Sequence, residues 1–237
     1  MAKVYKSRNP NRGRMYLCRL GMTACAAGAV GTAALAVLWR REIFLCLCAA
    51  AALGVLAWRL YHQAAVLRSG LAGENSAARA LAGLPQNYTV LCNAKLYAGA
   101  QRGEADAVVI GPNGVAVVEV KNHAGSLLGE ADAPTWRQTR PVKGGRPMEK
   151  TLPNPLRQNR RQVQLVRRIL GGEGLKCAVT GYVYFANPYA SVHVRGGEVY
   201  TGADALCRAL QRPQSPGLSA GEMKKALQVL QENGRRG

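Results

Sequence analysis

The sequence predicts an α/β domain with a mixed sheet flanked by helices, preceded by a two-helix transmembrane hairpin. Two observations carry this expectation. Two long uncharged runs stand near the N-terminus, and strand-like and helix-like segments alternate after them. With 237 residues, 48% of them apolar and 19% charged, the chain is long enough for one globular domain with an appendage. This composition excludes a disordered chain.

The two uncharged runs are Leu20–Trp39 and Ile43–Trp58. As a helix, the first would be about 30 Å long, which matches the hydrocarbon core of a bilayer. The second is shorter, but Arg59 can snorkel and let the helix extend to Tyr61. The short gap between the runs predicts an antiparallel membrane hairpin over 20–61. A signal peptide or a buried soluble helix is the alternative for the first run.

The basic residues around this hairpin predict its topology. Eight of them flank its open ends, against two in the turn. The eight are Lys3, Lys6, Arg8, Arg12, Arg14, Arg19, Arg59 and Arg68. Both termini and the globular domain are therefore expected in the cytoplasm, in a multi-pass protein of the cytoplasmic membrane. The expected organisation is a basic N-terminus over 1–19, the hairpin over 20–61, a linker over 62–70, a domain over 71–212 and a C-terminal helical extension over 213–237.

The chain is strongly basic, with 32 Lys and Arg against 13 Asp and Glu. Residues 63–237 alone hold 23 basic and 12 acidic residues, so the excess is more than a topology signal. Such an excess predicts a polyanionic partner, either nucleic acid or the anionic face of a lipid bilayer. The seven cysteines show neither a C-x-x-C pair nor zinc-ligand spacing, which excludes a disulfide scaffold and a zinc finger.

The clearest local pattern in the domain is a β-hairpin. Two β-rich runs, 104–110 and 115–121, surround a turn that contains Pro112, Asn113 and Gly114. Before it, the patterns predict a helix over 73–81 and a strand over 88–96. After it, they predict strands near 126–128 and 135–138, a helix from Asn154-Pro155 to Gly171-Gly172, strands over 176–185, 192–194 and 198–200, and helices over 204–210 and 220–231.

Pairing the hairpin symmetrically about its turn sets Asp106 across from Glu119. The two carboxylates then share a sheet face with Cβ atoms about 4.5–5.5 Å apart, and they repel unless a cation lies between them. Lys121 adds a positive charge on that face. Such a set can hold Mg²⁺ or Mn²⁺ through oxygen ligands while the lysine orients a water, which is chemistry that attacks phosphodiesters. The alternative is a solvent-facing salt bridge, and Glu104 is a rival carboxylate.

The helix that begins at Pro155 carries five arginines and no acid, over an apolar stripe. Its arginines are Arg157, Arg160, Arg161, Arg167 and Arg168. Beside a carboxylate–lysine site they suit nucleic-acid phosphates, although arginine-rich helix faces are often merely solvated. Gln158 and Gln162 stand one turn apart on the same helix face.

Together these residues resemble the nuclease-related domain family, a branch of the PD-(D/E)xK nuclease superfamily. The similarity covers roughly Leu71 to Leu210 and rests on Gly73-Glu74, Glu104-Ala-Asp106, Glu119-Val-Lys121, Trp136, Asn154-Pro155 with Gln158, and Phe185-Ala-Asn187-Pro188. The resemblance implies a restriction-endonuclease-like core. It also implies Glu74, Asp106 and Glu119 as metal ligands, Lys121 as catalytic lysine and Gln158 as a supporting polar residue.

The leading interpretation is a membrane-anchored, Mg²⁺-dependent nuclease or nuclease-like DNA-processing protein at the inner face of a bacterial cytoplasmic membrane. One alternative is a non-catalytic membrane anchor that binds nucleic acid, and another is a scaffold whose basic domain lies on anionic lipid. The three acids together with Lys121 favour the first, because a pure binder gains nothing from negative charges that face phosphate. Lipid binding does not explain opposed carboxylates.

Overall fold

A computed structural model describes residues 1–7, 9–38, 43–142 and 144–235. The chain forms two compact units. One combines Met1–Arg8 with Gly73–Gly237 and contains the described strands, and the other, Asn9–Ala72, is helical. The first residues of the chain, expected as part of a basic tail, therefore belong to the folded domain.

The helical unit contains α1 (Pro10–Leu38) and the first part of α2 (Ile43–Ala82). The two helices run antiparallel, because a Cβ on Gly21 would lie 3.0 Å from Leu60 Cδ1 and one on Gly28 would lie 3.2 Å from Leu53 Cδ1. Each helix has an apolar stretch long enough to cross a membrane, and almost none of that stretch is buried within the structure. The two long apolar helices of the predicted hairpin are thus present.

Helix α2 continues without a break from the helical unit into the domain. The linker expected over 62–70 is helical instead, because this segment contains no proline and only one glycine to end the helix. The helix expected over 73–81 is the last part of α2. Glu74 therefore sits on the final turns of a long helix rather than on a separate short one.

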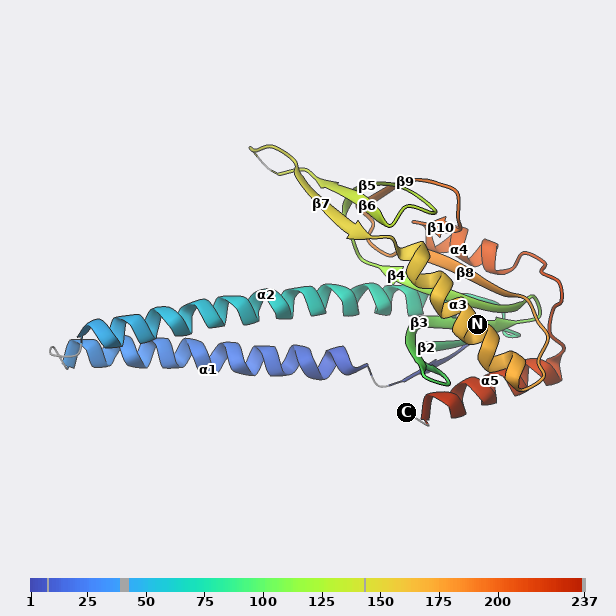
Figure 1. Ribbon diagram of the computed structural model, residues 1–237, viewed down its shortest axis with the longest axis horizontal. Helices are drawn as coiled ribbons and strands as arrows, with labels where there is room; N and C mark the ends of the chain where they lie inside the picture. The colour runs from blue at the N-terminus through green and yellow to red at the C-terminus, as the bar shows by residue number, and fades with distance from the viewer. Residues whose placement is uncertain (8, 39–42, 143, 236–237) are drawn as a thin grey trace. The chain divides into compact units, whose positions relative to one another are not determined.

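The domain is built on a mixed sheet with the strand order β1-β2-β3-β4-β8-β10. Figure 1 labels these strands with the exception of β1. Neighbours β2, β3 and β4 are antiparallel, whereas β1–β2, β4–β8 and β8–β10 are parallel pairs. The bounds are Lys3–Lys6 (β1), Thr89–Ala98 (β2), Gln101–Gly111 (β3), Gly114–Lys121 (β4), Val179–Phe185 (β8) and Val199–Tyr200 (β10). The predicted α/β class with a mixed sheet is confirmed.

Helices cover both faces of this sheet. On one face α3 (Pro155–Gly172) and α5 (Ala220–Arg235) pack on a core that includes Val117 of β4. On the other face the end of α2 and α4 (Ala203–Leu210) pack on Val118. Because side chains alternate along a strand, the next odd-numbered residues of β4 point toward the α3 side. The predicted C-terminal helix is α5, and it forms part of the domain core.

A second sheet has the order β7-β6-β5-β9. Its strands are Met148–Pro153 (β7), Thr135–Arg140 (β6), Gly125–Glu130 (β5) and Ala190–Arg195 (β9). A small core joins it to the first sheet, in which the Trp136 ring stacks on Phe185 at a centroid distance of 6.3 Å. Trp136 also covers Gly129, where a Cβ would lie 2.2 Å from the indole Cδ1. Because β5 follows β4 in the chain, the loop between them leads directly from the first sheet into the second.

Candidate active site

The end of β4 carries a carboxylate–lysine pair on the face covered by α3. Glu119 is 1% exposed, and its Oε1 accepts a hydrogen bond from Lys121 Nζ at 2.5 Å. The same Nζ donates to Gln158 Oε1 at 3.1 Å. The solvent-facing salt bridge considered as an alternative is therefore not what the structure shows, since the carboxylate is buried.

Gln162 holds the other oxygen of this carboxylate. Its Nε2 donates to Glu119 Oε2 at 2.7 Å and to the backbone oxygen of Glu104 at 2.8 Å. Within the described part of the chain, its own Oε1 is a buried oxygen without a hydrogen-bond partner. The sequence places Gln158 and Gln162 on one helix face, but only Gln158 is among the predicted site residues. The four-residue spacing was the available signal for Gln162.

Asp106 lies where β3 separates from both neighbouring strands. The predicted register holds from Gly111 opposite Gly114 to Ala107 opposite Val118, and the ladder ends there. On the other side, the β2–β3 ladder skips Asp106, and the opposing Asn93 has φ 55°, in the left-handed region that asparagine tolerates.

The side chain of Asp106 occupies this opening. Its Oδ2 accepts a hydrogen bond from the backbone N–H of Val120 at 2.7 Å, in place of a ladder bond. The predicted register is thus confirmed along the paired part of the hairpin. At the site itself, Asp106 meets β4 through a side-chain contact one residue beyond Glu119, rather than as a regular cross-strand pair.

Negative charge is crowded at this point. Burial, and after it the charge of Glu119, raise the pKa of Asp106 to about 8 against the opposing effects of the Val120 N–H and of Lys121. Glu74 adds a smaller effect in the same direction as Glu119. The single positive charge of Lys121 therefore does not balance the negative charges of Asp106, Glu119 and Glu74.

Glu74 lies in the neighbourhood of the site, where its charge contributes to the raised pKa of Asp106. Helix α2 approaches the chain just after β4 closely here, since a Cβ on Gly73 would lie 2.8 Å from Asn122 Cβ. Among the residues that the structure describes, no three His, Cys, Asp or Glu side chains are grouped closely enough to hold a metal ion. The structure brings Asp106 and Glu119 together, and Glu74 is close enough for its charge to act on Asp106.

The two central carboxylates nevertheless fit a hydrated Mg²⁺ or Mn²⁺ ion. Mg²⁺ in proteins keeps several waters and takes one or two carboxylates together with substrate phosphates. Asp106 and Glu119 supply hard oxygen donors, and their carboxylate oxygens keep further lone pairs beside the hydrogen bonds described. The partnerless buried oxygen of Gln162 adds an acceptor that an ordered water can satisfy.

The five arginines of α3 are all exposed, but they fall into two groups. Arg157, Arg160 and Arg161 line a hollow of about 460 Å³ at the start of α3, and Arg160 pairs with Asp132 at 2.7 Å. Toward the end of the helix, Arg167 donates to the Val179 backbone oxygen and Arg168 donates to Gln101. The first group therefore forms a concave basic surface, whereas the second makes contacts within the fold.

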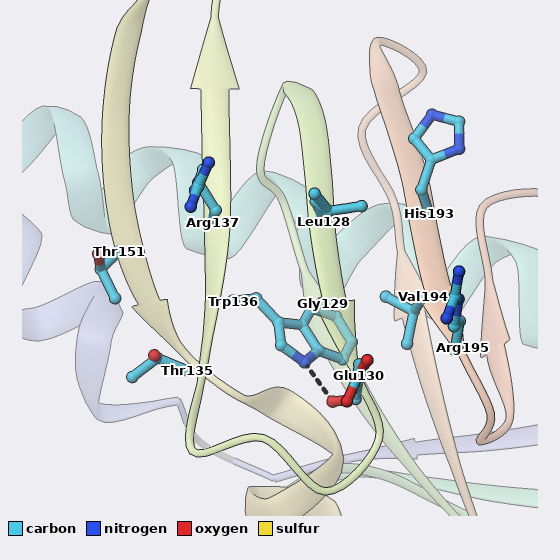
Figure 2. Close-up of a pocket in the computed structure, with 10 residues that line it drawn as sticks. All are labelled: Leu128, Gly129, Glu130, Thr135, Trp136, Arg137, Thr151, His193, Val194 and Arg195. Atoms are coloured by element: carbon cyan, nitrogen blue, oxygen red, sulfur yellow. Dashed lines mark hydrogen bonds between the residues drawn. The ribbon is translucent and has the colours of Figure 1, made fainter.

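A different hollow, of about 750 Å³, lies on the exposed face of the second sheet (Figure 2). Thr151, Arg137, Leu128 and His193 form a row across its four strands. These residues alternate with those, such as Gln138, that point to the inner side of the sheet. This hollow therefore opens away from the loop that follows Lys121. It is larger than the hollow at the start of α3, but it is not the site of the carboxylates.

Comparison with known families identifies a family for the segment that contains the site. Residues 69–186 match the family model of the nuclease-related domain. Searches of curated proteins and of solved structures found no match. The matched segment begins on α2 before Glu74 and ends just after β8, so it contains Asp106, Glu119, Lys121 and all of α3.

Proposed function

The chain belongs to the nuclease-related domain family, and on this premise we propose that it is a membrane-anchored, metal-dependent nuclease that hydrolyses phosphodiester bonds, with DNA as its substrate. The observation that carries the proposal is the position of Lys121 Nζ. It lies between the buried carboxylate of Glu119 and Gln158, beside the crowded carboxyl group of Asp106. If Lys121 and Glu119 formed only a structural ion pair, the fold would not need the carboxyl group of Asp106 beside them, where its negative charge is unfavourable.

Each side chain has a defined task in this proposal. Asp106 and Glu119 would hold Mg²⁺ or Mn²⁺, which when bound stabilises developing negative charge and makes water a stronger nucleophile at neutral pH. Lys121 Nζ orients the attacking water and offsets charge on the phosphoryl oxygens. Gln158 and Gln162 hold the lysine and the carboxylate in position through their hydrogen bonds. The exposed arginines at the start of α3 bind backbone phosphates.

The direct test uses the full chain in detergent micelles. We expect cleavage of plasmid, linear or single-stranded DNA in the presence of Mg²⁺ or Mn²⁺ and none in excess EDTA, with RNA as a comparison substrate. One observation favours a second candidate, a non-catalytic nucleic-acid-binding anchor: the described residues hold no three-acid metal group. Salt-sensitive DNA binding without cleavage under any of these metal conditions would decide for that candidate.

The pairing of β1 with β2 supports the membrane part of the proposal. Lys3–Lys6 pairs in parallel with residues 89–92, so the N-terminus and the domain form one sheet. If α1 crosses the bilayer outward, α2 must bring the chain back, because both ends of the helical pair lead into the same folded unit. The basic residues at these ends then favour a cytoplasmic position for that unit.

This topology predicts a labelling pattern in intact cells. In a cysteine-free version of the chain, a cysteine at Ile43, next to the turn, is expected to react with a membrane-impermeant maleimide. A cysteine at Asn233, in α5, is expected to react only after permeabilisation, because the domain lies on the cytoplasmic side. Labelling of the α5 position from outside would show that the proposed orientation is wrong.

A further inference from the structure

The inner face of the β6–β7 hairpin carries two cations that the proposed site does not use. Trp136, Gln138 and Arg140 share one face of β6 because side chains alternate along the strand. Gln138 pairs with Lys150 of β7 in the antiparallel register, so Lys150 lies on the same face. Trp136 and Gln138 are buried, which identifies this face as the inner one.

This face packs against the loop that directly follows Lys121. Gln138 Nε2 donates to the Ala124 backbone oxygen at 2.7 Å. Gly125, at φ +90°, approaches β6 so closely that a Cβ there would lie 2.4 Å from the Thr139 oxygen and 3.1 Å from Arg140 Cγ. The hairpin is therefore fixed to the segment that carries the lysine of the candidate active site.

The cations of the hairpin and of the site surround one imidazole. Burial, and after it the charges of Lys121, Arg140 and Lys150, lower the pKa of His123 to about 4. His123 is thus neutral near pH 7 and does not add to the positive charge. Three cations of two different sheets lie close enough to act on a single side chain.

These two cations lack counter-charges within the fold. Across the described ranges, neither Arg140 nor Lys150 takes part in an ion pair. The Nε of Arg140 is a buried donor without a hydrogen-bond partner among the same residues. A buried guanidinium donor without a partner is costly, and an anion that binds there would remove the cost.

We propose that Arg140 and Lys150, here called the hairpin clamp, bind the phosphodiester backbone of the substrate strand next to Glu119 and Lys121. This inference rests on the proposed nuclease function and names the part of the second sheet that would hold the substrate. A nucleic-acid strand that reaches Lys121 brings phosphates within reach of both cations. Both clamp cations act on the same imidazole, that of His123, as the lysine of the candidate active site, so nucleic acid is favoured over a lipid headgroup as the ligand of the clamp.

The same sheet offers a matched control on its other face. Arg137 precedes Arg140 by three residues on β6 and lines the exposed hollow together with Arg195 of β9 (Figure 2). The pair Arg137 and Arg195 therefore has the same net charge as the clamp and belongs to the same sheet. It differs in the direction in which its side chains point.

The test compares the Arg140→Ala/Lys150→Ala variant with the Arg137→Ala/Arg195→Ala variant, both as full chains in neutral nanodiscs. Binding of fluorescent DNA is measured in EDTA over a range of salt concentrations, so no cleavage is required. We expect the clamp variant to lose roughly tenfold or more in affinity and to lower the slope of log K against log salt by about two. The control variant should stay close to the parent, and Arg140→Lys should keep most of the affinity.

Three outcomes would overturn the clamp: DNA binding equal to that of the parent, an equal or larger loss in the control variant, or loss of binding to anionic lipid vesicles without loss of DNA binding. Circular dichroism melts of each variant separate lost binding from lost folding. If the parent binds DNA through the clamp but never cuts it, the clamp stands and the nuclease proposal falls. If the parent cuts DNA and the clamp variant binds DNA as tightly as the parent, the nuclease proposal stands and the clamp proposal falls.

Discussion

Replacing Lys121 with methionine or alanine is expected to reduce DNA cleavage by roughly 10²-fold or more while leaving most of the DNA affinity. Lys121 Nζ contacts both Glu119 and Gln158, so its loss removes the positive charge at the position where the phosphoryl group reacts. Affinity is spread over many exposed basic side chains and depends little on one partly buried lysine. Steady-state cleavage rates and metal-free binding curves of the full chain measure the two effects separately.

The fold of this variant needs its own control, because Glu119 is almost fully buried and would lose its ion-pair partner. Lys121→Met keeps the aliphatic stem, and its melting curve shows whether the domain is still folded. Lys176→Ala changes an exposed lysine and should leave cleavage unchanged. If a folded Lys121 variant cleaves DNA like the parent, this lysine is not part of the active site.

The shared face of Glu119 and Lys121 could be predicted from the sequence, because side chains alternate along a β-strand. A short turn fixes the hairpin register, and the register places Glu119 and Lys121 on the face opposite to Val118. The four-residue spacing puts Gln162 on the same helix face as Gln158, but its hydrogen bond to Glu119 could not be predicted, because that contact depends on how α3 is placed over the sheet. That placement is set by a close contact between Asn159 and Gly181, where a Cβ would lie 2.0 Å from Asn159 Oδ1.

Strands that pair although they lie far apart in the sequence are not marked by a local sequence pattern. β1 pairs with β2 across more than eighty residues, and β5 pairs in parallel with β9, so neither partner is marked by a turn. The second sheet was visible only as isolated strand-like patterns for this reason. The opening around Asp106 was also hidden, since nothing in the sequence required Asn93 to adopt a left-handed conformation. The same opening distinguishes the observed site from a regular cross-strand pair.

The metal-free protein is expected to lose stability as the pH rises toward 8, and Asp106→Asn is expected to remove this loss. Burial and the charge of Glu119 raise the pKa of Asp106 from 3.8 to about 8 in the folded state. Between these values the folded state keeps a proton that the unfolded state has released, so stability falls as the pH rises. Asparagine resembles the protonated form and can still accept a hydrogen bond from the Val120 N–H.

Urea or thermal unfolding in EDTA between pH 6.5 and 8.5 tests this expectation. His123, whose pKa is lowered to about 4 in the folded state, affects the parent and Asp106→Asn alike, so the comparison of the two removes its contribution. We expect Asp106→Asn to be clearly more stable than the parent at pH 8.5 and closer to it at pH 6.5. Asp132→Asn, which changes an exposed carboxylate, should follow the parent. Added Mg²⁺ or Mn²⁺ should stabilise the parent at pH 8.5 more than Asp106→Asn, because a bound cation favours the ionised carboxylate. Parallel pH profiles for the parent and Asp106→Asn would show that Asp106 does not carry the excess negative charge of the site.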